Sequence, residues 1–92
     1  MDKRTNAGYD IIKVIALPDE EYVLGIKTIN GENQYVTWCC VEKTNYHYGH
    51  YFSNYKPAIR DLYTRAQQNI KWTLENLLWK WNHLRLKHIF TR

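Results

Sequence analysis

The sequence predicts an α+β domain, a four-stranded antiparallel β-meander covered by a long or broken C-terminal α-helix. Residues 10–52 contain short runs rich in Ile, Val and aromatic residues, separated by turn signals. Residues 53–90 contain no glycine and a single proline, Pro57, and their apolar residues recur at helical spacing. With 92 residues the chain is expected to form one domain, in which residues 1–8 are a loose polar arm.

Four strands and three turns account for residues 10–52. The strands are predicted at Asp10–Leu17 (DIIKVIAL), Tyr22–Ile29 (YVLGIKTI), Gln34–Lys43 (QYVTWCCVEK) and Tyr46–Phe52 (YHYGHYF). Proline presets the first turn, Pro18–Glu21. Asn30-Gly31 is a strong hairpin signal, because a type I′ turn needs positive φ at both central residues. Thr44-Asn45 is the third turn, and such short connections favour a meander.

Two-residue turns at Asn30-Gly31 and Thr44-Asn45 would set the strand register and the faces of the sheet. Leu24 would then face Thr37, Tyr22 would face Cys39, and Cys39 would face His50. The more apolar face is expected to carry the helix, and it holds Tyr22, Leu24, Ile26, Tyr35, Cys39, Val41, Tyr48, His50 and Phe52. The other face is expected to be exposed, with Gly25 and Gly49 leaving room for Trp38. It presents Trp38, His47, Tyr51 and Lys27, which are either anchors for a protein partner or ordinary cross-strand pairs.

Ser53 is the expected N-cap of the helix, and Pro57 falls in its first turn. One apolar stripe is expected to cover the sheet, and it contains Tyr55, Ile59, Leu62, Tyr63, Ala66, Ile70, Leu74, Leu77, Trp81 and Leu84. A second stripe on the opposite side begins only at Trp72, and it contains Trp72, Trp79, Leu86 and Phe90. A helix that is apolar on two sides needs a partner on each of them.

The length of the helical segment raises the same question. A straight helix over residues 53–90 would span ~57 Å, whereas a compact domain of this size is roughly 30 Å across. Either the helix breaks near Gln67–Lys71 and folds back, or its overhang packs on another molecule. We favour a homodimer through the C-terminal helices, because it covers the second stripe without a further component.

The candidate residues for catalysis or metal binding are Cys39, Cys40, His47 and His50. Adjacent strand residues point to opposite faces, so Cys39 and Cys40 are poorly placed to share a zinc ion. A Cys39–His50 pair would lack an orienting third group and an oxyanion site. No phosphate loop, nucleophile elbow or HExxH motif is present. We therefore expect a protein that is not an enzyme and that has no metal and no cofactor.

Charge is distributed unevenly along the chain. Residues 1–55 hold five Lys or Arg against seven Asp or Glu, whereas residues 56–92 hold eight against two. This basic end predicts an acidic protein, a nucleic acid or a membrane surface as partner, or else a solvated helix face. The candidate basic patch is Lys71, Lys80, Arg85, Lys87 and Arg92. These residues are interleaved with Trp and His, which favours a small nucleic-acid-binding accessory protein as the alternative function.

Three further observations limit the location of the protein. The start MDKRTNAGYD lacks the apolar core of a signal peptide, and no apolar run reaches the ~18 residues of a spanning helix. The tail LLWKWNHLRLKHIF would suit a membrane interface, but dimer packing explains its apolar stripes equally well. The two adjacent cysteines do not form a disulfide framework. We expect a cytoplasmic protein with reduced thiols and no membrane partner.

The segments YVLG (22–25), YVTW (35–38), YGHYF (48–52) and AIRDLYTRA (58–66) resemble a group of small uncharacterised proteins encoded by phages and mobile elements of Gram-positive bacteria. The resemblance covers about residues 20–68. It implies a protein that binds and inhibits a host defence protein, such as a CRISPR nuclease. Many such inhibitors are acidic mimics of DNA. The basic tail differs from that pattern, and it would instead hold an acidic protein surface or a guide RNA.

Overall fold

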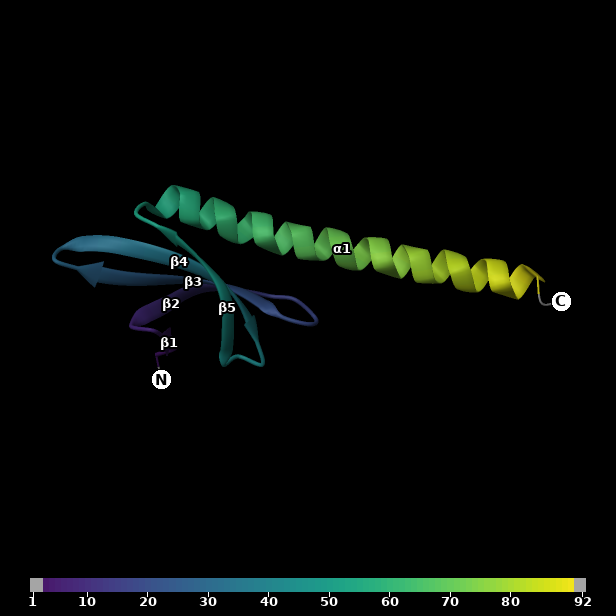
Figure 1. Cartoon of the computed structure of the whole chain (residues 1–92), viewed down its shortest axis with the longest axis horizontal. Coiled ribbons are helices and arrows are strands. Elements are labelled where there is room, and N and C mark those ends of the chain that lie inside the picture. The colour runs from purple at the N-terminus through teal and green to yellow at the C-terminus, as the bar shows by residue number, and fades with distance from the viewer. Residues whose placement is uncertain (1–2, 91–92) are drawn as a thin grey trace.

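The computed structural model describes the backbone of residues 3–90 and the side chains of residues 3–80. It confirms the α+β class, with one antiparallel sheet in the order β1-β2-β3-β4-β5 and one long helix across it (Figure 1). The elements are β1 (Thr5–Asn6), β2 (Tyr9–Ala16), β3 (Glu21–Ile29), β4 (Glu32–Val41), β5 (Asn45–Phe52) and α1 (Tyr55–Phe90). Each strand pairs with its neighbour in sequence, so the sheet is a meander of five strands rather than four.

The β3–β4 hairpin has the register that its turn predicts. Asn30 and Gly31 have φ of 52° and 81°, as a type I′ turn requires. Tyr22 pairs with Cys39 and Leu24 pairs with Thr37, which confirms both expected pairs.

Part of the predicted loose arm belongs to the sheet. Thr5–Asn6 forms β1 and pairs with the start of β2 through a turn at Ala7 and Gly8, where φ is 52° and 83°. Arg4 then reaches across the sheet, because its Nη2 donates to Glu21 Oε1 at 2.7 Å. A two-residue strand carries too few residues for an alternating pattern, and an Ala in the left-handed region is an unusual turn residue.

The predicted Cys39–His50 pair is wrong. Cys39 pairs with His47, and His50 pairs with Thr37. Two features shift the register: the β4–β5 turn is longer than predicted, spanning residues 42–44, and β5 carries a bulge at Tyr48, where φ is 54°. Because paired residues share a face, His47 belongs with Cys39 rather than with Trp38.

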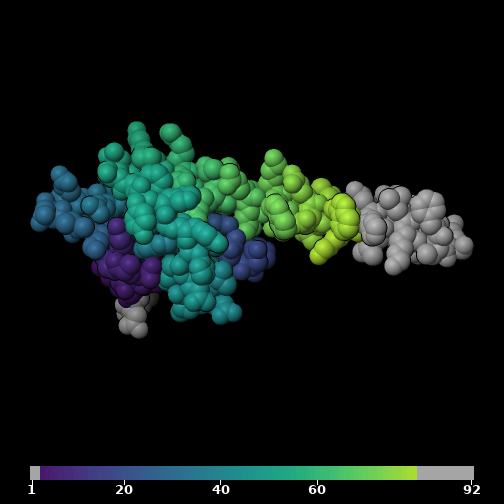
Figure 2. Space-filling view, in the orientation of Figure 1, coloured from purple at the N-terminus to yellow at the C-terminus, as the bar shows by residue number. Residues whose placement is uncertain are grey.

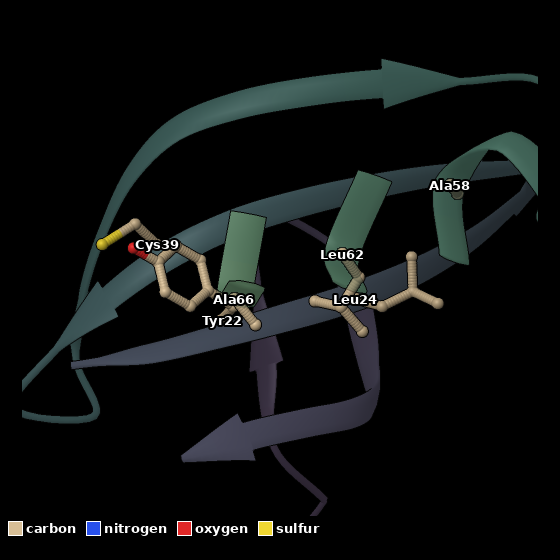
Figure 3. Packing of buried hydrophobic residues seen from close by; sticks show 6 residues of the cluster. All are labelled: Tyr22, Leu24, Cys39, Ala58, Leu62 and Ala66. Carbon is tan, nitrogen blue, oxygen red and sulfur yellow. The ribbon is translucent and has the colours of Figure 1, made fainter. Parts of the chain in front are cut away.

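The helix packs on one face of the sheet through small and branched side chains. Ala58, Leu62 and Ala66 are buried against Leu24 and Tyr22 of β3, as Figure 3 shows. Their spacing of four residues places them on one side of α1. This face is the one that the sequence predicted for the helix.

The opposite face also has a buried core, which corrects the prediction that it is exposed. Trp38 is only 5% exposed, and it packs edge-on against Tyr9 and Tyr46 with ring centroids 5.6 and 5.5 Å away. The predicted role of the glycines is confirmed. A Cβ on Gly49 would lie 2.9 Å from Trp38 Nε1, and one on Gly25 would lie 3.3 Å from the same indole.

The helix α1 continues without a break from Tyr55 to Phe90, so the alternative with a break near Gln67–Lys71 is not the one observed. It begins after Asn54, one residue later than the expected Ser53 cap implies. The molecule is consequently long, with extents of 69 × 27 × 19 Å. Figures 1 and 2 show the helix leaving the sheet and projecting beyond it.

Leu62 should contribute strongly to stability, because it is fully buried between α1 and the sheet. Leu62→Ala is expected to lower the free energy of unfolding by about 2–5 kcal/mol, measured by urea denaturation. Leu78→Ala is the matched control, since Leu78 lies on the same helix but is exposed. Equal losses for the two variants would contradict this account of the helix–sheet interface.

Candidate functional site

A buried polar contact sets the position of α1 on the sheet. Thr37 of β4 is fully buried, and its hydroxyl donates to Asp61 Oδ2 at 2.6 Å. Arg65 Nη1 donates to the Thr37 hydroxyl at 3.1 Å and to the Thr37 carbonyl at 3.0 Å. His50 Nδ1 lies 2.9 Å from the same Asp61 oxygen. These groups are costly to bury unpaired, so they oppose sliding of the helix.

A second polar cluster lies one helical turn further on, around Glu20. Tyr22 Oη and Asn69 Nδ2 both donate to Glu20 Oε1 at 2.6 Å, and the Cys39 thiol donates to Oε2 at 2.8 Å. Partial burial opposes ionisation of Glu20, but these three hydrogen bonds outweigh it and lower the pKa of the carboxyl. Burial and the bond to Glu20 together raise the pKa of Cys39 to about 12. The Cys39 thiol is therefore a hydrogen-bond donor at neutral pH rather than a thiolate nucleophile.

This Glu20 cluster lines a cleft of about 270 Å³ between the β5 side of the sheet and the helix. Arg65 and Tyr48 also line it, and the Arg65 guanidinium lies over the Tyr22 ring at 5.7 Å. Within the described residues, no buried side-chain nitrogen or oxygen lacks a hydrogen-bond partner. The polar groups of the cleft thus bond to one another and tie the helix to the sheet.

Beyond Asn69 the helix presents its apolar side chains to solvent. We call residues 70–90 the helix extension, of which the side chains of residues 70–80 are described. Six large apolar side chains there are between 43% and 69% exposed, and they are Ile70, Trp72, Leu74, Leu77, Leu78 and Trp79. The stripe predicted to cover the sheet does so at Leu62 and Ala66, but the prediction is wrong at Ile70, Leu74 and Leu77, because the helix has left the sheet by then.

The turn between β2 and β3 lies beside the start of the helix extension. Pro18 and Asp19 line a second cleft of about 270 Å³ together with Trp72, Leu77 and Lys80. The turn itself is held by a hydrogen bond from the Leu17 amide to the Glu20 carbonyl, at 2.9 Å. The lining of this mainly apolar cleft includes one acidic side chain, Asp19 of the turn, and one basic side chain, Lys80 of the helix.

The structure separates the residues that the sequence grouped as partner-binding or basic. Trp72 and Trp79 are exposed on the helix extension, and Lys71 and Lys80 lie beside them, also exposed. Trp38 is buried on the sheet. Tyr51 and Lys27 of the same predicted face both lie near Tyr9, which packs on Trp38. His47 does not join them, because it pairs with Cys39 on the other face, and its ring lies 6.1 Å from that of Tyr48. The remaining candidates lie outside the described side chains, and they are Arg85, Leu86, Lys87, Phe90 and Arg92.

Sequence reasoning missed the residues that hold the helix in place. Asp61, Arg65 and Asn69 recur every four residues on α1, and each bonds to a group of the sheet or of its turns. Their spacing is a usable signal, because it places three polar residues on one side of the helix, next to the apolar stripe.

Glu20→Gln should make stability less dependent on pH in the acidic range. The folded state lowers the pKa of Glu20, so its ionised form stabilises the fold above the unfolded-state pKa, and this stabilisation is lost as pH falls through the folded-state pKa. Urea denaturation should show the wild type more stable at pH 7, with the gap closing in the acidic range. Glu32→Gln, at an exposed position, is the control for a change in carboxylate number. A gap that stays constant down to low pH would contradict this role of Glu20.

Within the described residues, no group of three or more His, Cys, Asp or Glu is arranged to hold a metal ion. The described part of the chain also has no helix with both the length and the apolarity to cross a lipid bilayer. Comparison of the chain with family models, with curated proteins and with solved structures gave no match.

Proposed function

We propose that this chain is a non-enzymatic binding protein that holds a partner protein through its helix extension. The observation that carries the proposal is the continuous helix that leaves the sheet with six large apolar side chains exposed over residues 70–80. Exposed apolar patches of this kind mark interaction sites. Two of the six are tryptophans, the residue type most enriched among side chains that dominate binding energy.

The balance of apolar and basic side chains favours a protein over a nucleic acid. Over residues 70–80 the helix presents six large apolar side chains but only two cations, Lys71 and Lys80. Binding to nucleic acid depends mainly on cations that reach phosphates. Arg65, the nearest arginine on the sheet side of the helix extension, already donates to Thr37. An acidic protein surface suits both the apolar and the basic groups.

The resemblance to proteins of phages and mobile elements supplies the class of target. A small protein of that kind would act by occupying a host defence protein, and we propose a nuclease such as a CRISPR nuclease as the first target to test. The helix extension would hold the target, while the domain at its base would block access to the neighbouring surface.

Removing one residue from each apolar stripe should weaken binding. Trp72→Ala combined with Leu77→Ala is expected to reduce affinity for the host target at least about tenfold, because truncating central apolar anchors commonly costs more than ~1–2 kcal/mol. The measurement is capture from host lysate, followed by inhibition of the captured and purified protein. Tyr51→Ala is the control, since Tyr51 is exposed on the sheet and away from the helix extension.

Two outcomes would contradict the proposal. The first is loss of capture in Tyr51→Ala with full capture in the double variant, which would move the site to the sheet. The second is tight binding of generic DNA or RNA that falls steeply with salt and is weakened by Lys71→Gln with Lys80→Gln. That result would favour the nucleic-acid-binding alternative.

A further inference from the structure

One side of the helix extension carries an apolar seam with coiled-coil spacing. Ile70, Leu74 and Leu77 are separated by four and then three residues, which are the d, a and d positions of a heptad repeat. All three are about half exposed. In the sequence the same spacing continues at Trp81 and Leu84. Trp72 and Trp79 fall at the f positions of this repeat, on the opposite side of the helix.

The seam begins on the domain itself. Tyr63, one heptad before Ile70, is partly exposed, and Lys13 of β2 places its Nζ 5.4 Å from the centre of the Tyr63 ring. A partner lying along the seam would therefore meet a cation where the helix leaves the sheet. Lys13 thus lies beside α1 one heptad before the helix extension begins.

The positions that flank the seam are basic wherever they are charged. Lys71 occupies an e position and Lys80 a g position, and both are exposed. The sequence places Arg85 at the next e position and Lys87 at the next g position. Glu75 is the sole acidic residue of the helix extension, and it lies at a b position, away from the seam.

This charge pattern selects among the helices that could cover the seam. In a parallel pair the e residues face the g residues of the other helix, and in an antiparallel pair each faces its own kind. A second copy of this chain would therefore bring Lys and Arg against Lys and Arg in either orientation, which is unfavourable. The homodimer expected from the two stripes alone is disfavoured on this ground. A helix with Asp and Glu beside its own apolar seam is attracted instead.

We infer that the seam binds an acidic amphipathic helix of the partner protein. This inference rests on the proposed function, since it takes the helix extension to be a protein-binding element, and it adds the chemistry and shape of what is bound. The partner inserts apolar side chains between Ile70, Leu74 and Leu77, and its carboxylates lie along Lys71 and Lys80. Binding of this kind buries the apolar face of a helix, and the flanking charges select which partner helix binds.

The test uses the full chain and two synthetic helical peptides with identical Leu and Ile seams. One peptide carries Glu at all e and g positions, and the other carries Lys there. Calorimetry should show binding of the Glu peptide and not of the Lys peptide. Lys71→Glu combined with Lys80→Glu should weaken binding of the Glu peptide about tenfold and strengthen binding of the Lys peptide. Circular dichroism of each variant checks that the helix is retained.

Two further variants locate the binding side of the helix. Leu74→Ser combined with Leu77→Ser should abolish binding of the Glu peptide. Asn76→Ala, at a c position away from the seam, is the matched control and should leave the peptide affinity unchanged, while Trp72→Ala tests the opposite side of the helix. Equal binding of both peptides, or binding that depends on Trp72 and not on the two leucines, would overturn the inference.

The remaining outcomes separate this inference from the proposed function. If neither peptide binds while host capture is still lost in the double variant Trp72→Ala with Leu77→Ala, the proposed function stands and the seam inference fails. If sedimentation shows a dimer that Leu74→Ser with Leu77→Ser converts to monomer, the occupant is a second copy, and the inference is overturned.

Discussion

The hydrogen bonds from Thr37 to Asp61 and from Arg65 to Thr37 determine where the long helix lies on the sheet. Apolar contacts through Ala58, Leu62 and Ala66 hold the helix down, but contacts of this kind tolerate small shifts along the helix axis. The polar groups do not tolerate them, because a shift of one turn, about 5.4 Å, would leave a buried hydroxyl and a carboxylate without partners. The length of helix that projects from the domain follows from this position.

The sheet is stabilised on both faces although a helix covers only one. On the face away from α1, Tyr9 of β2 and Tyr46 of β5 pack against Trp38 of β4, and two glycines make space for the indole. Arg4 adds a further link, since it donates to Tyr46 Oη at 2.9 Å and lies over the Tyr46 ring. Aromatic side chains supply large buried areas from few residues. A short chain can in this way stabilise its sheet while only the first part of its helix packs on it.

Local rules in the sequence were sufficient for the fold class and for the β3–β4 register. The Asn30-Gly31 turn carries its own geometry, and the pairing of Tyr22 with Cys39 follows by counting outward from it. The β4–β5 pairing could not be obtained in the same way. The turn has one more residue than predicted, and β5 has a bulge at Tyr48; both shift which residues pair. The alternation of apolar and polar residues does not reveal either feature.

The candidate site was predictable only in part. The excess of apolar residues after Trp72 indicated an unsatisfied surface, and the structure shows those described residues exposed. Apolar periodicity did not show that the first stripe is also uncovered at Ile70 and Leu74, because periodicity does not report where a sheet ends. Burial of Trp38 was missed for a related reason, since it depends on Tyr9, a residue that the prediction placed in neither the arm nor a strand.

The continuity of α1 means that the domain acts as a template for its own protruding segment. Isolated helices form poorly in water because the first turn is costly to form. Here that first turn is already ordered against the sheet, and the remainder needs only to be propagated from it. The surface that we propose to bind a partner is therefore preorganised at a distance from the core that orders it. Under that proposal, the contacts between Leu62 and the strands would add to the affinity for a partner that does not touch them.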